Sequence, residues 1–229
     1  MIVSASSDKD HTADSAFPIV VLISGSGSNL QAIIDASKST IPGLEICLVI
    51  SNRPDAYGLE RASRAGIATR VIDHRNYHDR ASFEQALMAE IDSHSPKLVV
   101  LAGFMRILEA NFVRHYEGRL INIHPSLLPR YPGLNTHRRA IENGDDEAGA
   151  TVHFVSAEVD SGPTIIQARV PIHANDTPDD LAARVLQQEH VIFPKAIGWI
   201  AEGRLTIQHG EVLLDGHKSP EQQLYNDEF

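Results

Sequence analysis

Apolar runs and amphipathic stretches alternate along most of the chain. The apolar runs are short and rich in β-branched residues, as in strands buried on both faces of a sheet, and the stretches between them repeat apolar positions with a helical period. We expect strands at 17–24, 44–51, 68–73, 97–103, 119–124, 150–155 and 164–170, and helices at 30–38, 57–65, 82–94, 111–116, 136–144 and from 178 onward. Strands that alternate with helices predict a three-layer, Rossmann-like α/β fold with a mostly parallel central sheet.

The C-terminal half carries two further signals. The connection at 156–163 is too short for a crossover helix, so the last two strands are expected to form an antiparallel pair. Asp176 or Thr177 precedes Pro178 and can cap the start of a long helix. We expect this helix to continue past a bend near Pro194.

Composition narrows the class of protein. With 229 residues and 42% hydrophobic content, the chain is expected to form one domain at 17–215, a polar extension at 1–16 and a polar tail at 216–229. The net charge of −10 argues against a nucleic-acid partner. The single cysteine, Cys47, lies in an apolar run and is expected in the core. Neither a signal-peptide pattern nor a run of about 18 apolar residues occurs, so we expect a cytoplasmic protein without membrane contact.

Residues 25–29, Gly-Ser-Gly-Ser-Asn, lie between the first strand and the first helix. Glycines let the backbone approach a ligand closely, and the first turn of a helix offers unpaired N–H groups, which together suit a phosphate. A dinucleotide fingerprint would need glycine in place of Leu30 and an acid in place of Ser51 or Asn52, and the lysine of a P-loop is missing. A dehydrogenase or NTPase is therefore disfavoured, and a tight turn without a ligand is the alternative.

Asn122 and His124 occupy alternate positions at the end of the fifth strand and therefore face the same side. Pro125, Pro129 and Pro132 stiffen the segment that follows. An amide and a histidine aimed at one point can stabilise a developing oxyanion. The alternative is a histidine whose ring bonds to backbone at a strand end.

Asp160 lies in the loop 157–163 between the last two strands. A carboxylate beside His124 would favour the imidazolium and orient its ring, but Asp160 could equally form an Asx turn. His74 and His78 are four residues apart in a polar stretch without a further ligand pattern, so a solvated loop is favoured over a metal site.

Four of these stretches occur together in a recognisable order. They are VVLISGSGSNLQAIID at 20–35, LAGFMRIL at 101–108, NIHPSLLPRYPGLNTH at 122–137 and GATVHFVSAEVDSGP at 149–163. The chain resembles the phosphoribosylglycinamide formyltransferases over about residues 18–215. The resemblance implies a three-layer formyltransferase fold. It also implies that the formyl group of 10-formyltetrahydrofolate passes, without a metal, to the amine of glycinamide ribonucleotide in purine biosynthesis.

The resemblance also implies roles for particular residues. Catalysis would fall to Asn122, His124 and Asp160, and ribonucleotide binding to Gly27, Ser28, Asn29 and Glu189. Folate contacts would come from Arg80, Met105, Arg106, Ile107, Leu108, Asn122, Ser156, Ala157, Glu158, Val159 and Asp160. The family often has an acidic residue at the position of Ala157, so this departure concerns the folate loop and not the catalytic aspartate.

Three rival functions share parts of this pattern. A 10-formyltetrahydrofolate hydrolase would use the same three catalytic residues with water as the acceptor. A methionyl-tRNA formyltransferase would be expected to add a C-terminal domain and a basic surface. A non-catalytic nucleotide-binding module would keep the turn at 25–29 but not Asn122, His124 and Asp160 together. We therefore expect an enzyme that acts on two small molecules, as a monomer or homodimer.

Overall fold

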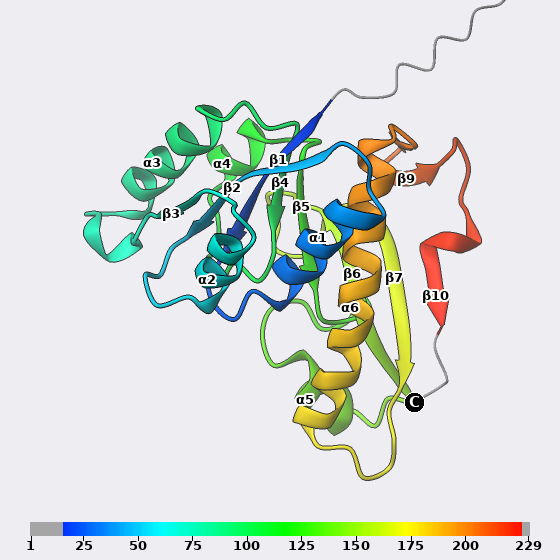
Figure 1. The fold of residues 1–229 in the computed structure, drawn as a ribbon. Coiled ribbons are helices and arrows are strands. Elements are labelled where there is room, and N and C mark those ends of the chain that lie inside the picture. Colours follow the sequence, from blue (N-terminus) through cyan, green and yellow to red (C-terminus); the bar gives the residue numbers. More distant parts are fainter. Residues whose placement is uncertain (1–15, 226–229) are drawn as a thin grey trace, which may run out of the picture.

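An eight-stranded sheet runs through the middle of the part of the chain that the structure describes, residues 16–225 (Figure 1). In this computed structural model the strand order is β10-β7-β6-β5-β4-β1-β2-β3. The strands are β1 (Phe17–Ile23), β2 (Leu44–Ser51), β3 (Thr69–Val71), β4 (Leu98–Leu101), β5 (Leu120–His124), β6 (Glu147–Phe154), β7 (Thr164–Pro171) and β10 (Gln223–Tyr225).

Strand direction confirms the predicted sheet. The pairs from β3 across to β5 are parallel, and β10 is parallel to β7, whereas β6 runs antiparallel to both of its neighbours. The short connection between β6 and β7 forces that pair to be antiparallel, as expected. Since β7 again runs in the direction of β5, β6 is the one reversed strand of this sheet within residues 16–225.

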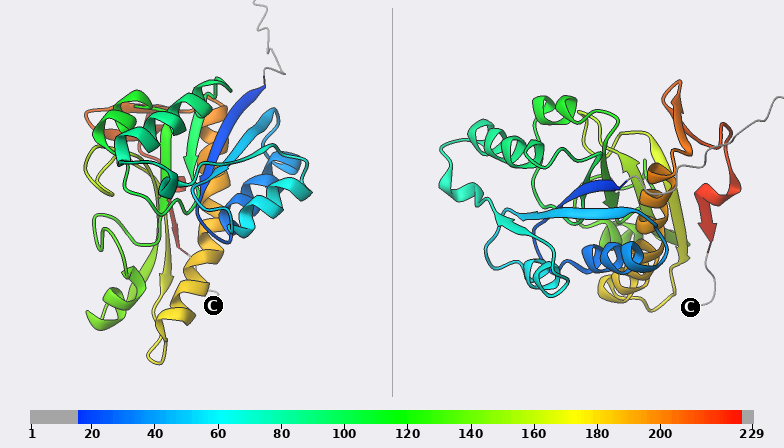
Figure 2. Two further views of the ribbon diagram at one scale, coloured as in Figure 1. Left: turned by 90° about the vertical axis from the view of Figure 1, so that its left-hand side faces the viewer. Right: turned by 45° about the horizontal axis from the view of Figure 1, so that its top comes forward.

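Helices cover both faces of the sheet (Figures 1 and 2). On one face lie α1 (Ser28–Ser39), α2 (Tyr57–Arg64) and α6 (Pro178–Ala201), with α1 packed beside α6. On the other face lie α3 (Arg80–Asp92) and α4 (Ala110–His115), while α5 (Thr136–Glu142) follows the loop after β5. A short 3₁₀ helix, His74–Asn76, precedes α3.

The long helix begins as the sequence predicts. Thr177 is the N-cap, because its hydroxyl accepts a hydrogen bond from the N–H of Asp180, and Pro178 occupies the first helical position. Asp176, the other candidate cap, instead forms an ion pair with Arg184. The helix continues through Pro194 as far as Ala201.

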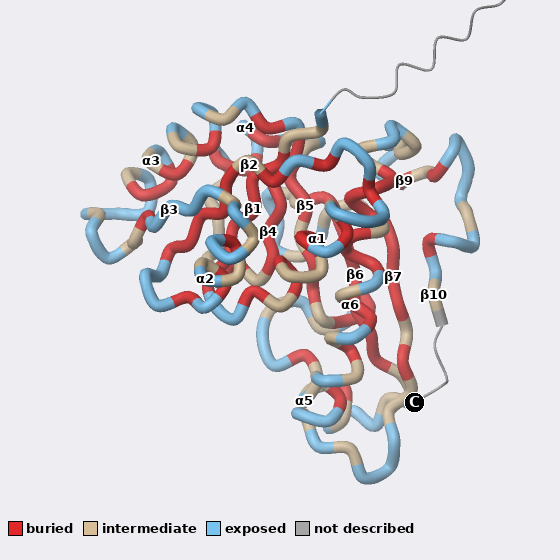
Figure 3. The backbone as a smooth tube through the Cα atoms, viewed as in Figure 1, coloured by how far each residue is buried: buried red, intermediate tan, exposed pale blue. Residues whose placement is uncertain are grey.

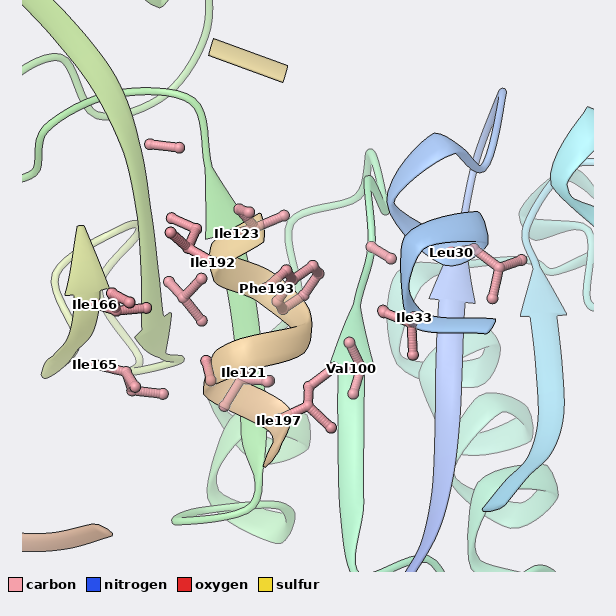
Figure 4. Packing of buried hydrophobic residues seen from close by; sticks show 14 of the residues in the cluster. Leu30, Ile33, Val100, Ile121, Ile123, Ile165, Ile166, Ile192, Phe193 and Ile197 are labelled. Carbon is pink, nitrogen blue, oxygen red and sulfur yellow. The ribbon is translucent and has the colours of Figure 1, made fainter. Parts of the chain in front are cut away.

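Alternate side chains of β1 enter two separate apolar clusters. Ile19, Val21 and Ile23 pack with α1 and α6, whereas Val20 and Leu22 pack with α3 and α4. Figure 3 shows the strands buried between exposed helix surfaces, and Figure 4 shows Leu30 and Ile33 of α1 and Phe193 and Ile197 of α6 in the first cluster. Because both faces of the strands are covered, the strands read as continuous apolar runs.

The C-terminal part of the chain differs from the expectation of a loose polar tail. A hairpin of β8 (Leu205–Gln208) and β9 (Glu211–Leu214), and a 3₁₀ helix at Pro220–Gln222, precede β10. The side-chain amide of the buried Gln222 donates to the carbonyl oxygens of Ile165 and Val212, 3.0 and 3.1 Å away. Residues 220–225 are therefore ordered against the sheet, because a polar segment can pair through its backbone.

The remaining expectations about the ends of the chain stay predictions. The extension expected at 1–16 lies almost wholly outside the described residues, and so do residues 226–229. The division into a domain at 17–215 and flanking segments is likewise untested. Within residues 16–225, each helix is too short or too polar to cross a membrane.

The order of strands places a topological switch point between β1 and β4. From β1 the chain builds β2 and β3 on one side, and β4 and β5 on the other. The connections that follow β1 and β4 therefore lead to opposite sides of the sheet, and ligands of such sheets bind at this switch point.

Candidate active site

The glycine turn after β1 packs tightly on the start of α2. Gly27 has φ +68° and is the N-cap of α1, without a side-chain hydrogen bond at that cap. A Cβ atom at Gly27 would lie 2.5 Å from the Cα atom of Gly58, and the N–H of Gly58 donates to the carbonyl oxygen of Gly25 at 3.0 Å. Only glycine allows this approach, and the turn leaves the first N–H groups of a 12-residue helix available to an anion.

Asn29 and Glu189 meet across the gap between α1 and α6, although 160 positions separate them in the sequence. The side-chain amide of Asn29 donates to the carboxylate of Glu189 at 2.6 Å, and both residues are buried. Burial raises the pKa of Glu189, and the hydrogen bond from Asn29 acts in the opposite direction. The side-chain oxygen of Asn29 is buried and accepts no hydrogen bond from the described residues, so it can receive one from a ligand.

Replacing Glu189 by glutamine should stabilise the fold and weaken binding of the ribonucleotide that the sequence analysis expects at this site. Burial raises the pKa of Glu189 above its usual 4.5 in the folded state. The free energy of unfolding therefore falls as the pH rises above 4.5. The neutral side chain removes this loss, and we expect a melting temperature about 2–4 °C higher at neutral pH. Melting curves from pH 4 to pH 8 and ribonucleotide titrations test both effects.

The exposed Glu142 of α5 supplies the control, because Glu142→Gln removes the same charge at the surface. That variant should change neither quantity. A Glu189→Gln protein that melts at the wild-type temperature at every pH would contradict the account of its burial.

Asn122 is oriented by a histidine that the sequence analysis did not single out. The register of β5 and β6 places Asn122 opposite His153, and Asn122 Nδ2 lies 3.2 Å from His153 Nε2. His153 Nδ1 lies 2.9 Å from the carbonyl oxygen of Phe154, which can only accept, so Nδ1 carries the proton. Burial lowers the pKa of His153 and favours the neutral ring, whose Nε2 then accepts from Asn122. The amide keeps its second N–H for a substrate.

His124 lies between two oxygen acceptors at the end of β5. Its Nδ1 is 3.4 Å from a carboxylate oxygen of Asp160, and its Nε2 is 2.9 Å from the carbonyl oxygen of Tyr131. The carbonyl oxygen of Tyr131 can only accept, so Nε2 carries a proton, and Nδ1 faces the Asp160 carboxylate. The same Asp160 oxygen accepts from the N–H of Gly133 at 2.8 Å, which fixes the carboxylate to the loop after β5. The structure thus brings Asn122, His124 and Asp160 to one place.

Two buried polar residues hold that loop in shape, and sequence analysis missed both. The hydroxyl of Thr151 in β6 donates to the carbonyl oxygen of Ser126 at 2.6 Å and accepts from the N–H of Leu128 at 3.1 Å. The amide of Gln167 in β7 donates to the carbonyl oxygen of Leu128 at 2.8 Å. The one available signal was a polar residue in each of two apolar strands. The Leu128–Pro129 peptide bond in this loop is cis.

The residues expected around folate lie on two loops near this centre. Loop 105–108 follows β4, the neighbour of β5, and loop 156–160 reaches His124 through Asp160. The side chains of Met105, Ile107 and Val159 are 72%, 62% and 52% exposed, so they offer apolar surface to a planar ligand. The other members of this set are Arg106, Leu108, Ser156, Ala157 and Glu158, and the hydroxyl of Ser156 donates to the carbonyl oxygen of Glu158.

Arg80 stands apart from Asn122, His124 and Asp160. It is exposed at the start of α3, and it makes no hydrogen bond or ion pair with the other candidate residues described by the structure. Burial raises the pKa of Glu84, and the charges of Arg80 and Arg106 oppose that shift, so both arginines lie around this carboxylate. This location leaves the guanidinium of Arg80 available to a ligand.

A metal centre is not formed by the residues in view. Nowhere in residues 16–225 do three or more His, Cys, Asp or Glu side chains gather closely enough to hold a metal ion. His74 Nδ1 lies 3.3 Å from the backbone oxygen of Asn52, and His78 is exposed. Cys47 is a free thiol, half-buried beside the second apolar cluster.

A mostly parallel sheet with a glycine turn and an Asn-His-Asp group at its carboxyl edge is typical of an α/β enzyme. The formyl transferase family model matches residues 18–197. The chain belongs to this family and, within it, to the phosphoribosylglycinamide formyltransferases.

The similarity extends over nearly the whole chain. The phosphoribosylglycinamide formyltransferase of Escherichia coli (strain K12) is 55% identical over 210 residues, which are 92% of this chain and 99% of that protein. The protein of the same name from Haemophilus influenzae is 46% identical over 209 residues, 91% of this chain and 99% of that protein. The solved structure of the phosphoribosylglycinamide formyltransferase of Coxiella burnetii superposes with a TM-score of 0.86 at 51% identity, covering 92% of this chain and 99% of that one.

Proposed function

We propose that Asn122, His124 and Asp160 catalyse formyl transfer in this chain. The reaction is that of the family: the formyl group of 10-formyltetrahydrofolate passes to the amine of 5-phosphoribosylglycinamide, a step of de novo purine biosynthesis. The observation that carries the assignment is the position of His124, with Nδ1 at 3.4 Å from the Asp160 carboxylate. A ring held between that carboxylate and the Tyr131 carbonyl is fixed in orientation for donation to a substrate.

Each of the three residues has a distinct task in the transfer. Attack of the amine on the formyl carbon places negative charge on the formyl oxygen, and the free N–H of Asn122 and the imidazolium of His124 can donate to it. Nε2 of His124 already donates to the carbonyl oxygen of Tyr131. When the substrate oxygen arrives, this N–H must either donate to both oxygens or leave the Tyr131 carbonyl for the substrate. Asp160 orients the ring of His124 and can help, through water, to move the proton of the amine to the departing folate nitrogen.

The two substrates are assigned to different parts of the carboxyl edge. We infer that the ribonucleotide binds with its phosphate at Gly27, Ser28 and Asn29 and with Glu189 beside it, because these residues form one connected site. Folate is assigned to Arg80, to loop 105–108 and to loop 156–160. The exposed apolar side chains of the two loops support this assignment.

The setting of the enzyme follows from charge and chemistry. A net charge of −10 disfavours a nucleic-acid partner, and both substrates are small molecules. We infer a cytoplasmic enzyme, since its single cysteine is a free thiol. We expect it to be a monomer or a homodimer.

The choice of acceptor tests the proposed function. Purified protein is given 10-formyltetrahydrofolate with 5-phosphoribosylglycinamide, with water alone, or with charged initiator tRNA, and release of tetrahydrofolate is followed. We expect rapid release of tetrahydrofolate, together with formylated product, only in the mixture that contains 5-phosphoribosylglycinamide. Equal release in water would identify a hydrolase, and release in none of the mixtures would contradict catalysis.

A further inference from the structure

The hydroxyl of Ser24 joins two loops at the switch point between β1 and β4. Ser24 is the first residue after β1 and is 4% exposed. Its hydroxyl donates to the side-chain oxygen of Asn52 at 2.6 Å and accepts from the N–H of Met105 at 2.8 Å. Its own N–H donates to the carbonyl oxygen of Gly103 at 3.1 Å. One buried side chain therefore connects the loops that follow β4 and β2 to the end of β1.

The connected segments belong to both halves of the proposed site. Ser24 directly precedes the glycine turn 25–29, and Met105 is the first residue of loop 105–108. Asn52 opens the segment that leads into α2, and the N–H of Gly58 in that helix holds the carbonyl oxygen of Gly25. The Ser24 hydroxyl is thus a direct link between the phosphate turn and the expected folate wall.

The link to Ser24 is one of the few hydrogen bonds that hold the backbone of loop 105–108. No helix or strand is formed between the end of β4 at Leu101 and the start of α4 at Ala110, so few backbone bonds fix the segment. The side chain of Met105 is 72% exposed while its N–H points inward to Ser24. The hydroxyl of Ser24 therefore anchors the backbone at Met105, whose apolar side chain is exposed to solvent.

We propose that Ser24 is a positioning residue for the transfer reaction: its hydroxyl fixes loop 105–108 relative to the phosphate turn. This rests on the proposed function, because it takes loop 105–108 as the wall of the folate site. Removing the hydroxyl leaves the buried side-chain oxygen of Asn52 and the part-buried N–H of Met105 without this partner. The loop then has to be ordered by the folate itself, which weakens folate binding and misaligns the formyl carbon.

Ser51 provides a closely matched control. It ends β2, the strand beside β1, and is fully buried. Its hydroxyl also makes two hydrogen bonds, to the carbonyl oxygen and from the N–H of Arg53, but both remain within its own loop. Ser51→Ala therefore removes the same atom and the same number of bonds at the same edge without touching loop 105–108.

The test compares Ser24→Ala with Ser51→Ala in the full chain. Both variants should lower the melting temperature to a similar extent. Ser24→Ala should raise KM for 10-formyltetrahydrofolate about tenfold and lower kcat about tenfold, with KM for the ribonucleotide within about twofold of wild type, because Gly58 still holds the turn. Ser51→Ala should leave all three constants near wild type. Ser24→Thr, which restores a hydroxyl, should recover most of the loss.

Direct titration with tetrahydrofolate separates this proposal from the proposed function, since binding needs no turnover. A Ser24→Ala protein that binds tetrahydrofolate about tenfold more weakly supports the positioning role, even if the wild type fails to formylate the ribonucleotide. Unchanged tetrahydrofolate affinity in folded Ser24→Ala, or an equal loss in Ser51→Ala, would overturn it. If Ser24→Ala does not fold, Ser24→Thr and Ser24→Cys are titrated instead, and wild-type affinity in the cysteine variant would count against the proposal.

Discussion

Asp160→Asn is expected to slow formyl transfer by roughly 10²- to 10⁴-fold, the range typical of lost acid–base support. Asparagine keeps the shape of the side chain and can still accept from the N–H of Gly133, but the negative charge 3.4 Å from His124 is gone. His124→Ala should be at least as damaging, because it removes the donor itself. Turnover at saturating concentrations of both substrates measures the effect, and titrations should show both affinities largely intact.

Asp92 offers a matched control for this prediction. Asp92 and His115 form another Asp-His pair, with 2.8 Å between carboxylate and ring, on the exposed side of α3 and α4. Asp92→Asn should leave turnover at the wild-type value. Similar losses in Asp92→Asn and Asp160→Asn would show that the effect is structural and not chemical.

Gly27→Ala is expected to weaken ribonucleotide binding by about 100-fold while folate binding stays near wild type. The added Cβ atom would lie 2.5 Å from the Cα atom of Gly58, so the turn has to move away from α2. The N–H groups that we assign to the phosphate move with it. Calorimetric titration of the variant with each substrate measures the two affinities.

A second glycine distinguishes the effect of left-handed backbone strain from the effect of the steric clash at Gly27. Gly66 has φ +75°, close to the φ of +68° at Gly27, but a Cβ atom there would meet nothing within 4 Å. Gly66→Ala should therefore lose stability without losing affinity. If Gly27→Ala weakened binding of both substrates equally, the assignment of the turn to phosphate would be contradicted.

The periodicity of apolar residues predicts the core elements because burial on both faces determines that pattern. The strand expected at 44–51 is found as Leu44–Ser51, and the long helix begins at Pro178 behind its Thr177 cap. The pattern fails for the strands that follow the long helix. The exposed β8 carries no such signal, and β10 joins the sheet through backbone bonds to β7, which no side-chain pattern encodes.

The candidate site is only partly visible in the sequence. The rule that ligands bind at the carboxyl ends of parallel strands selects the turn at 25–29 and the end of β5. The contact of Asn29 with Glu189 depends on how α6 packs beside α1, and spacing alone does not reveal it. His153 is placed by strand register, and the buried Ser24 acts through loops distant in sequence, so both look like ordinary polar residues until the fold is known.

The central claim is that His124 and Asp160 act as one unit in formyl transfer. Single-turnover transfer from 10-formyltetrahydrofolate to 5-phosphoribosylglycinamide, measured for wild type, Asp160→Asn, His124→Ala and the double variant, tests it most directly. Residues that act together lose their joint contribution only once, so the double variant should be little slower than His124→Ala alone. If the two losses instead multiply in the double variant, His124 and Asp160 contribute independently and the account is contradicted.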